Sequence, residues 1–131
     1  MGKRTILAVV AVFLAWSLLD IVIHQLILMG EYGATADLWR SPDEIMIGLI
    51  YVVTLISAVV FVSIYKFLIC RKDLGRATQY GLLFGVAIGI GMGYGSYAVM
   101  PLTHTIALVW FLGTVVQGGV AGALLGLIVK E

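Results

Sequence analysis

The sequence predicts an all-α integral membrane protein, a bundle of four transmembrane helices in one domain over residues 1–131. Hydrophobic residues make up 62% of the chain and charged residues 11%, whereas a soluble domain is about one quarter charged. The mean hydropathy is +1.11. This composition excludes a water-soluble fold and a disordered chain. The net charge of +1 gives no surface for nucleic acid.

Four apolar stretches are long enough to cross hydrocarbon, which needs about 20 residues. The predicted spans cover residues 5–29, 45–69, 77–99 and 105–129. They are separated by an outer loop (30–44), a short basic loop (70–76) and a turn containing Pro101. Polarity does not alternate every second residue, so the strands of a membrane barrel are not predicted. The first apolar run exceeds the 7–15 residues of a signal peptide, so we expect it to remain as a span.

The basic residues predict the orientation of the bundle. Seven of the eight lie on one side of the predicted spans: Lys3, Arg4, Lys66, Arg71, Lys72, Arg76 and Lys130. The outer loop instead carries four acids and Arg40 alone. Basic loops stay in the cytoplasm, so both termini are predicted to be cytoplasmic.

The outer loop ends in the motif Ser41-Pro42-Asp43-Glu44, which matches a capping box with proline at the first helical position. It predicts that the second helix starts at Pro42. Trp39 before it is typical of the headgroup region of a membrane. Arg40 has two interpretations: an ion pair with Asp37, Asp43 or Glu44, or a docking contact with a partner or an anionic headgroup.

Glycine recurs every fourth residue in the last two spans and gives each helix a smooth face. The positions are Gly81, Gly85, Gly89 and Gly93 in the third span, and Gly118, Gly122 and Gly126 in the fourth. Such faces allow close backbone contact. They are explained by packing of these two helices on each other, by self-association, or by a groove for a ligand or lipid. Gly91 and Gly95 lie off the stripe and predict a bend or close packing on two sides.

Polar residues gather in the outer half of the predicted bundle. Asp20 and His24 are four residues apart and share a helix face, and Gln25 lies beside His24. At 1.5 Å per residue, Thr54, Thr114 and Gln117 fall near the depth of Asp20 or the span centre. The aromatic residues at the depth of His24 are Tyr51, Tyr94 and Trp110. A polar cluster is therefore available at this depth.

Ionisable residues inside a membrane are costly and usually have a pairing or functional role. Asp20 and His24 have four interpretations: a hydrogen-bonded structural pair, a proton or cation site reached from outside, a metal or haem site, and a contact with a lipid headgroup or quinone. A metal would need more ligands than Asp20, His24 and the distant His104. We expect His104 to be solvated in the turn that contains Pro101. No catalytic residue, metal site or cofactor is predicted.

Several segments resemble a group of small, uncharacterised bacterial four-span membrane proteins. They are Asp20-x-x-x-His24, Leu38-Trp39-Arg40, Met92-Gly93-x-Gly95-x-Tyr97-x-Val99-Met100-Pro101 and Trp110-Phe111-Leu112-Gly113-Thr114. The resemblance covers most of the chain. It implies a bacterial inner membrane and the same four-helix plan, and it implies no activity.

The sequence leaves two main functional hypotheses. One is a non-catalytic accessory or scaffold subunit of a larger membrane complex, with the lipid bilayer, other membrane subunits or further copies of the chain as partners. The alternative is a small oligomeric transporter or channel that uses Asp20 and His24. A redox subunit in contact with haem or quinone is a third. The direction of Asp20 separates the first two, since a wet cavity favours transport and a dry, paired site favours structure.

Overall fold

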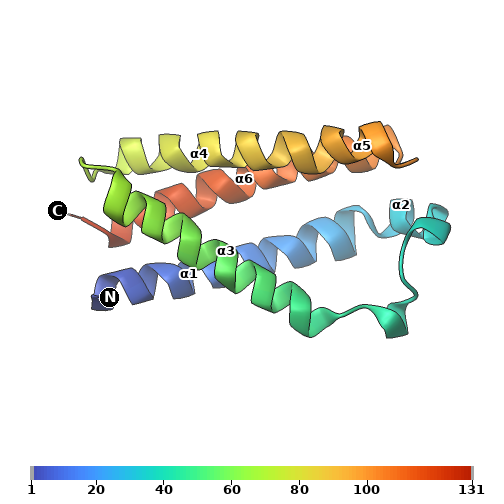
Figure 1. The fold of residues 1–131 in the computed structure, drawn as a ribbon, viewed down its shortest axis with the longest axis horizontal. Helices are drawn as coiled ribbons and strands as arrows, with labels where there is room; N and C mark the ends of the chain where they lie inside the picture. The colour runs from blue at the N-terminus through green and yellow to red at the C-terminus, as the bar shows by residue number, and fades with distance from the viewer. Residues whose placement is uncertain (1, 131) are drawn as a thin grey trace.

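The computed structural model describes residues 2–130, which form helices joined by loops, with no strand in that range (Figure 1). Four helical segments are long and apolar enough to cross a membrane: Lys3–Ile27, Ile47–Leu68, Leu74–Val99 and His104–Ile128. Each end lies within three residues of the predicted span. The chain is therefore all-helical, and its four candidate spans indicate a multi-pass membrane protein.

Each long segment is built from one or more elements. The first consists of α1 (Lys3–Asp20) and the π-helical η1 (Ile21–Ile27), and the second is α3 (Ile47–Leu68). The third joins α4 (Leu74–Ile90), the π-helical η4 (Gly91–Gly95) and α5 (Ser96–Val99), and the fourth is α6 (His104–Ile128). The outer loop contains α2 (Met29–Ala34) and two 3₁₀ turns, η2 (Ala36–Leu38) and η3 (Pro42–Glu44).

Side-chain caps set the starts of the last two long helices. Asp73 accepts a hydrogen bond from the backbone N–H of Arg76 at 2.8 Å, so α4 begins at Leu74, three residues before the predicted span. The Thr103 hydroxyl likewise accepts from the N–H of Ile106 at 3.2 Å at the start of α6. Both caps satisfy amides that the first turn leaves free.

The predicted capping box is wrong. The Ser41 side chain makes no capping hydrogen bond, and Pro42–Glu44 form one 3₁₀ turn in which the Glu44 N–H bonds to the Ser41 carbonyl at 2.9 Å. Ile45 is extended, and α3 begins at Ile47. An extended residue covers about 3.3 Å against 1.5 Å in a helix, so this link lengthens the connection between the outer loop, which contacts α6 through Glu31 and Tyr32, and the start of α3.

The helices α4 and α6 are in backbone contact through their glycine faces. A Cβ atom added at Gly85 would lie 2.8 Å from the Thr114 carbonyl oxygen, and one at Gly89 would lie 2.9 Å from that of Phe111. Added Cβ atoms at Gly81 and Gly118 would each collide with the carbonyl oxygen of the other residue. The two glycine stripes therefore meet within one chain.

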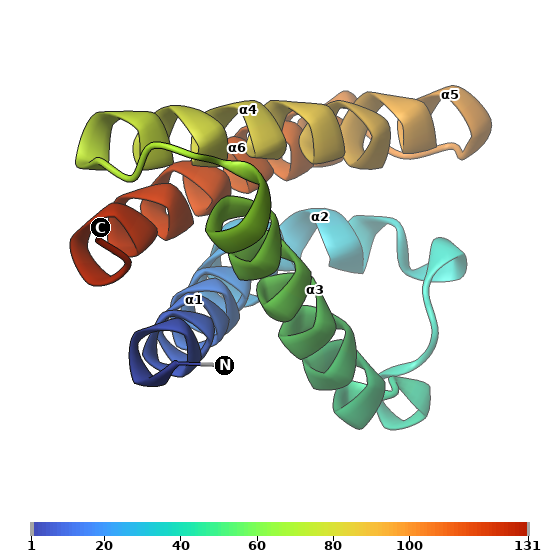
Figure 2. The same cartoon turned by 60° about the vertical axis from the view of Figure 1, so that its left-hand side comes forward.

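The helix α3 diverges from the other three. It packs on α1, and its outer part points away from α4 and α6 (Figures 1 and 2). Its buried residues, Ala58, Phe61, Val62 and Tyr65, all lie in the half that leads to α4. They join the main core formed with α1, α4 and α6. No residue from 47 to 57 is buried, so the bundle is closed at one end and splayed at the other.

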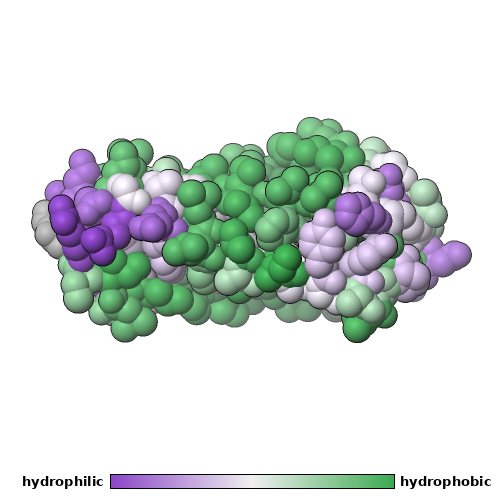
Figure 3. All heavy atoms as spheres, turned by 90° about the horizontal axis from the view of Figure 1, so that it is seen from above, coloured by the Kyte–Doolittle hydropathy of each residue, from purple (hydrophilic) through white to green (hydrophobic). Residues whose placement is uncertain are grey.

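Both ends of the described chain lie at the closed end of the bundle, beside the loop from α3 to α4 (Figure 1). A space-filling view shows a broad apolar belt between two polar ends (Figure 3). The predicted cytoplasmic basic residues of α1 and of the α3–α4 loop thus share one end, because the four long helices run antiparallel in sequence order.

Candidate functional site

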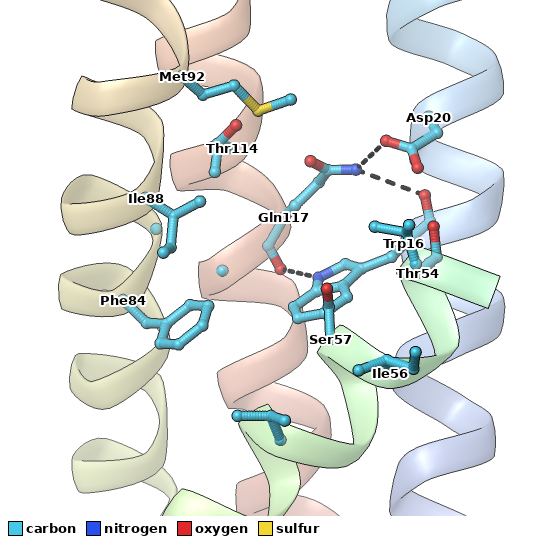
Figure 4. A pocket seen from close by; sticks show the side chains of 14 residues that line it. Trp16, Asp20, Thr54, Ile56, Ser57, Phe84, Ile88, Met92, Thr114 and Gln117 are labelled. Atoms are coloured by element: carbon cyan, nitrogen blue, oxygen red, sulfur yellow. Dashed lines mark hydrogen bonds between the residues drawn. The ribbon is translucent and has the colours of Figure 1, made fainter. Parts of the chain in front are cut away.

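The polar residues of the first and fourth spans form one hydrogen-bonded pair. The Gln117 side-chain amide on α6 donates a 2.7 Å hydrogen bond to Asp20 Oδ1 at the end of α1 (Figure 4). Trp16, one turn before Asp20, donates from Nε1 to the Gln117 backbone carbonyl at 2.8 Å. The Gln117 amide also reaches the Trp16 carbonyl at 3.4 Å. Gln117 therefore ties α1 to α6 near the middle of the bundle.

This pair faces a cleft of about 340 Å³ between α1, α3, α4 and α6 (Figure 4). Asp20 is its one ionisable lining residue among those described, and 32% of its side chain is exposed. The other polar side chains are Thr54, Ser57, Thr114 and Gln117, and the remaining lining is mostly apolar. The cleft exists because the outer half of α3 leaves the bundle.

The threonine hydroxyls of the cleft use their hydrogens within their own helices. Thr54 donates to the Ile50 carbonyl at 2.9 Å, and Thr114 donates to the Trp110 carbonyl at 2.7 Å. A hydroxyl that has donated in this way still has lone pairs to accept with. With the Asp20 carboxylate, the cleft is thus richer in acceptors than in donors, and its chemistry favours a cation or a hydrogen-bond donor.

A second set of contacts leads from Asp20 to the outer end of the bundle. His24 Nε2 lies 3.9 Å from Asp20 Oδ1, and His24 Nδ1 lies 2.6 Å from the Tyr32 hydroxyl. Trp110 Nε1 donates to the same hydroxyl at 2.7 Å. Since an indole nitrogen can only donate, the Tyr32 oxygen accepts from Trp110 and its hydrogen is free for His24. A neutral His24 then carries its proton on Nε2, toward Asp20.

Tyr32 is a site residue that the sequence did not single out. Burial raises the pKa of Tyr32, the hydrogen bond from Trp110 lowers it, and the nearby Asp20 charge raises it further. Its ring meets Trp39 edge-on at 5.3 Å between centroids, and Trp39 meets Trp110 at 5.9 Å. The tyrosine lies on α2 and reaches the site through its contacts with His24 of η1, whose ring lies 5.9 Å away between centroids, and with Trp110 of α6. The contact with α6 has no signal in the local sequence.

Trp16 and Ser57 also line the cleft without having been assigned to the site. Trp16 had a usable signal, since it lies one helical turn before Asp20 on the same face. For Ser57 the signal was weaker: it lies three residues after Thr54 and so shares its helix face, but the sequence does not show which way that face of α3 points. Ile21–Ile27 and Gly91–Gly95 are π-helical beside the site, and such wide turns are frequent at functional sites.

Several predicted site residues lie elsewhere. Gln25 is exposed, and its side chain has no hydrogen bond within residues 2–130. Tyr51, on the diverging α3, contacts the Phe13 ring of α1. The Tyr94 hydroxyl is hydrogen-bonded to His104 Nε2 at 3.0 Å, so these two residues form a separate pair beside the turn between α5 and α6. Arg40 has no ion pair in the described chain, which contradicts its pairing with Asp37, Asp43 or Glu44.

Among residues 2–130, no group of three or more histidine, cysteine, aspartate or glutamate side chains is placed to hold a metal ion. No protein-family model, curated protein or solved structure matches the chain. Function is therefore inferred from the chain's own geometry.

Proposed function

We propose that this chain is a non-catalytic multi-pass protein of a bacterial inner membrane that serves as an accessory or scaffold subunit of a larger membrane complex. The observation that supports this best is the splayed α3. Its outer half has no buried residue, and the polar cleft opens where it leaves α4 and α6.

An open cleft that contains the Asp20 carboxylate is unfavourable against lipid tails. Hydrocarbon offers no partner for a carboxylate, and ionisable groups within a membrane usually face protein or a water-filled cavity. A helix from another subunit, seated between α3 and α4, would cover Asp20 and Thr54. It would also give the outer half of α3 a second neighbour besides α1.

The proposed orientation places both termini in the cytoplasm. Lys3, Arg4 and the basic α3–α4 loop share one end of the bundle, and the opposite end carries the acidic outer loop. Positive charge in short loops is retained on the cytoplasmic side. A cysteine-labelling experiment with an impermeant reagent tests this: with Cys70 replaced by serine, a cysteine at Asp43 should react in intact cells and one at Lys72 should not.

Site-directed photo-crosslinking in the native membrane tests the accessory role. A photoreactive residue at Ile56, which lines the cleft, should give a discrete adduct with another membrane protein, and the complex should migrate as a large band on a native gel. The matched control is Leu83, which is 63% exposed on α4 and does not line the cleft. Equal adducts from both positions, or a chain that migrates alone, would contradict the proposal.

A small oligomeric transporter or channel is the second candidate, favoured by the exposed part of Asp20. The carboxylate faces the cleft, and His24 and Tyr32 link it to the outer end. The variant Asp20→Asn separates the candidates, because asparagine keeps the acceptor for Gln117 but cannot ionise. Normal assembly with loss of proton-linked flux in proteoliposomes would favour transport. Unchanged flux, with the complex intact, would favour the accessory role.

A further inference from the structure

A second and larger hollow lies at the splayed end of the bundle, apart from the cleft that Asp20 lines. It has a volume of about 790 Å³ and lies between the outer loop and the start of α3. One wall comes from Tyr32, Trp39 and Trp110, and the other from the apolar side chains at Ile45, Met46 and Leu49. We call it the outer groove.

The outer groove has one charged lining residue in the described chain, Arg40. Its side chain is exposed and forms no ion pair within residues 2–130. The acids of the same loop do not line the groove, and the Glu31 carboxylate accepts a hydrogen bond from Thr103 at 2.8 Å. The groove thus combines a long apolar surface with a single cation at its rim.

The lining of the groove indicates contact with lipid. Its apolar wall includes Leu49 and Ile50, exposed side chains at the start of the candidate membrane span Ile47–Leu68. Its aromatic wall contains two tryptophans, and these residues gather at the level of lipid headgroups. With α3 spanning the membrane as proposed, the groove would run from the headgroup level into the hydrocarbon.

We propose that the outer groove binds one phospholipid, with an acyl chain between the tryptophan wall and α3 and the phosphate at Arg40. The guanidinium is suited to phosphate because it is always charged and can donate two parallel hydrogen bonds. The lipid would bury Leu49 and Met46, and it would brace the link between the outer loop and α3. This site is independent of the protein partner proposed above.

Native mass spectrometry of the purified chain, titrated with phosphatidylglycerol, tests the proposal. One lipid should bind with higher affinity than the rest, and diacylglycerol with the same acyl chains should not replace it. Arg40→Gln should weaken this binding about tenfold, as expected for loss of a charge-assisted hydrogen bond. Arg4→Gln, which removes an exposed arginine at the opposite end, is the matched control and should leave it unchanged.

Filling the groove gives a second variant that does not alter charge. Leu49→Trp should exclude the acyl chain and reduce binding, whereas Leu83→Trp on the exposed surface of α4 should not. Both proteins should elute as the wild type does in gel filtration, which shows that they fold. Equal binding by wild type and Arg40→Gln, or equal binding of diacylglycerol, would overturn the proposal.

Discussion

Asp20 and Gln117, 97 residues apart in sequence, are joined by a 2.7 Å hydrogen bond that ties α1 to α6. Replacing Gln117 by leucine would leave the carboxylate without this donor. Measured hydrogen bonds between membrane helices are worth about 0.6 kcal/mol, and bonds to charged groups about 1.5–3 kcal/mol. We therefore expect the free energy of unfolding in detergent to fall by about 1–2 kcal/mol.

Gln25→Leu is the matched control for that variant. It makes the same chemical change at an exposed residue of η1 whose side chain has no hydrogen bond within residues 2–130. Its unfolding free energy should equal that of the wild type. Equal losses from the two variants would show that hydrophobicity, and not the Asp20 contact, determines the result.

The Tyr32 hydroxyl links His24 to Trp110, so Tyr32→Phe should destabilise the outer end of the bundle. The substitution leaves the partly buried Trp110 N–H without its acceptor, at a cost of about 0.5–1.5 kcal/mol. Thermal unfolding followed by tryptophan emission measures the change. Tyr97→Phe is the control, because the Tyr97 ring contacts His104 but its hydroxyl has no hydrogen bond within residues 2–130. If both variants melt alike, the Tyr32 bridge contributes nothing.

Tyr32 should also make stability depend on alkaline pH. Burial holds its pKa above the ordinary value of 10.0, so the folded protein keeps the phenolic proton after the unfolded chain has lost it. Its contribution is complete below pH 10 and declines as the pH rises through the folded pKa. Subtracting the unfolding curve of Tyr32→Phe from that of the wild type isolates this effect. A difference that stays constant from pH 9 to 12 would contradict it.

The sequence was sufficient to predict the all-helical class and the four long apolar helices, because apolar runs of about 20 residues are a local signal. The same holds for the faces of Asp20, Thr114 and Gln117, which follow from helical spacing. It did not predict the capping turn at Ser41 or the role of Tyr32. Both depend on how far α3 diverges and on how α2 contacts α6, and those are tertiary contacts between distant residues.

The close contact of α4 and α6 predicts that alanine is harmful at one glycine and harmless at another on the same helical segment. A methyl group at Gly85 would lie 2.8 Å from the Thr114 carbonyl, so Gly85→Ala must push the helices apart, at about 1–3 kcal/mol. Gly91 has no atom within 4 Å of its added Cβ atom, and Gly91→Ala should be neutral or slightly stabilising. Unfolding in detergent compares the two variants. Equal effects would mean that helix propensity, and not the α4–α6 contact, controls stability here.

The Thr103 hydroxyl makes two hydrogen bonds, and three substitutions separate their contributions. It accepts from the Ile106 N–H to cap α6 and donates to Glu31 Oε2 at 2.8 Å, which holds the outer loop on the last turn. Thr103→Val loses both bonds and should cost about 1–2 kcal/mol, whereas Thr103→Ser keeps both and should cost little. Glu31→Ala removes only the loop contact, so it should leave α6 intact and increase amide hydrogen exchange in α2. Unchanged exchange in α2 would show that the outer loop is held by its aromatic contacts at Trp39 and Trp110 instead.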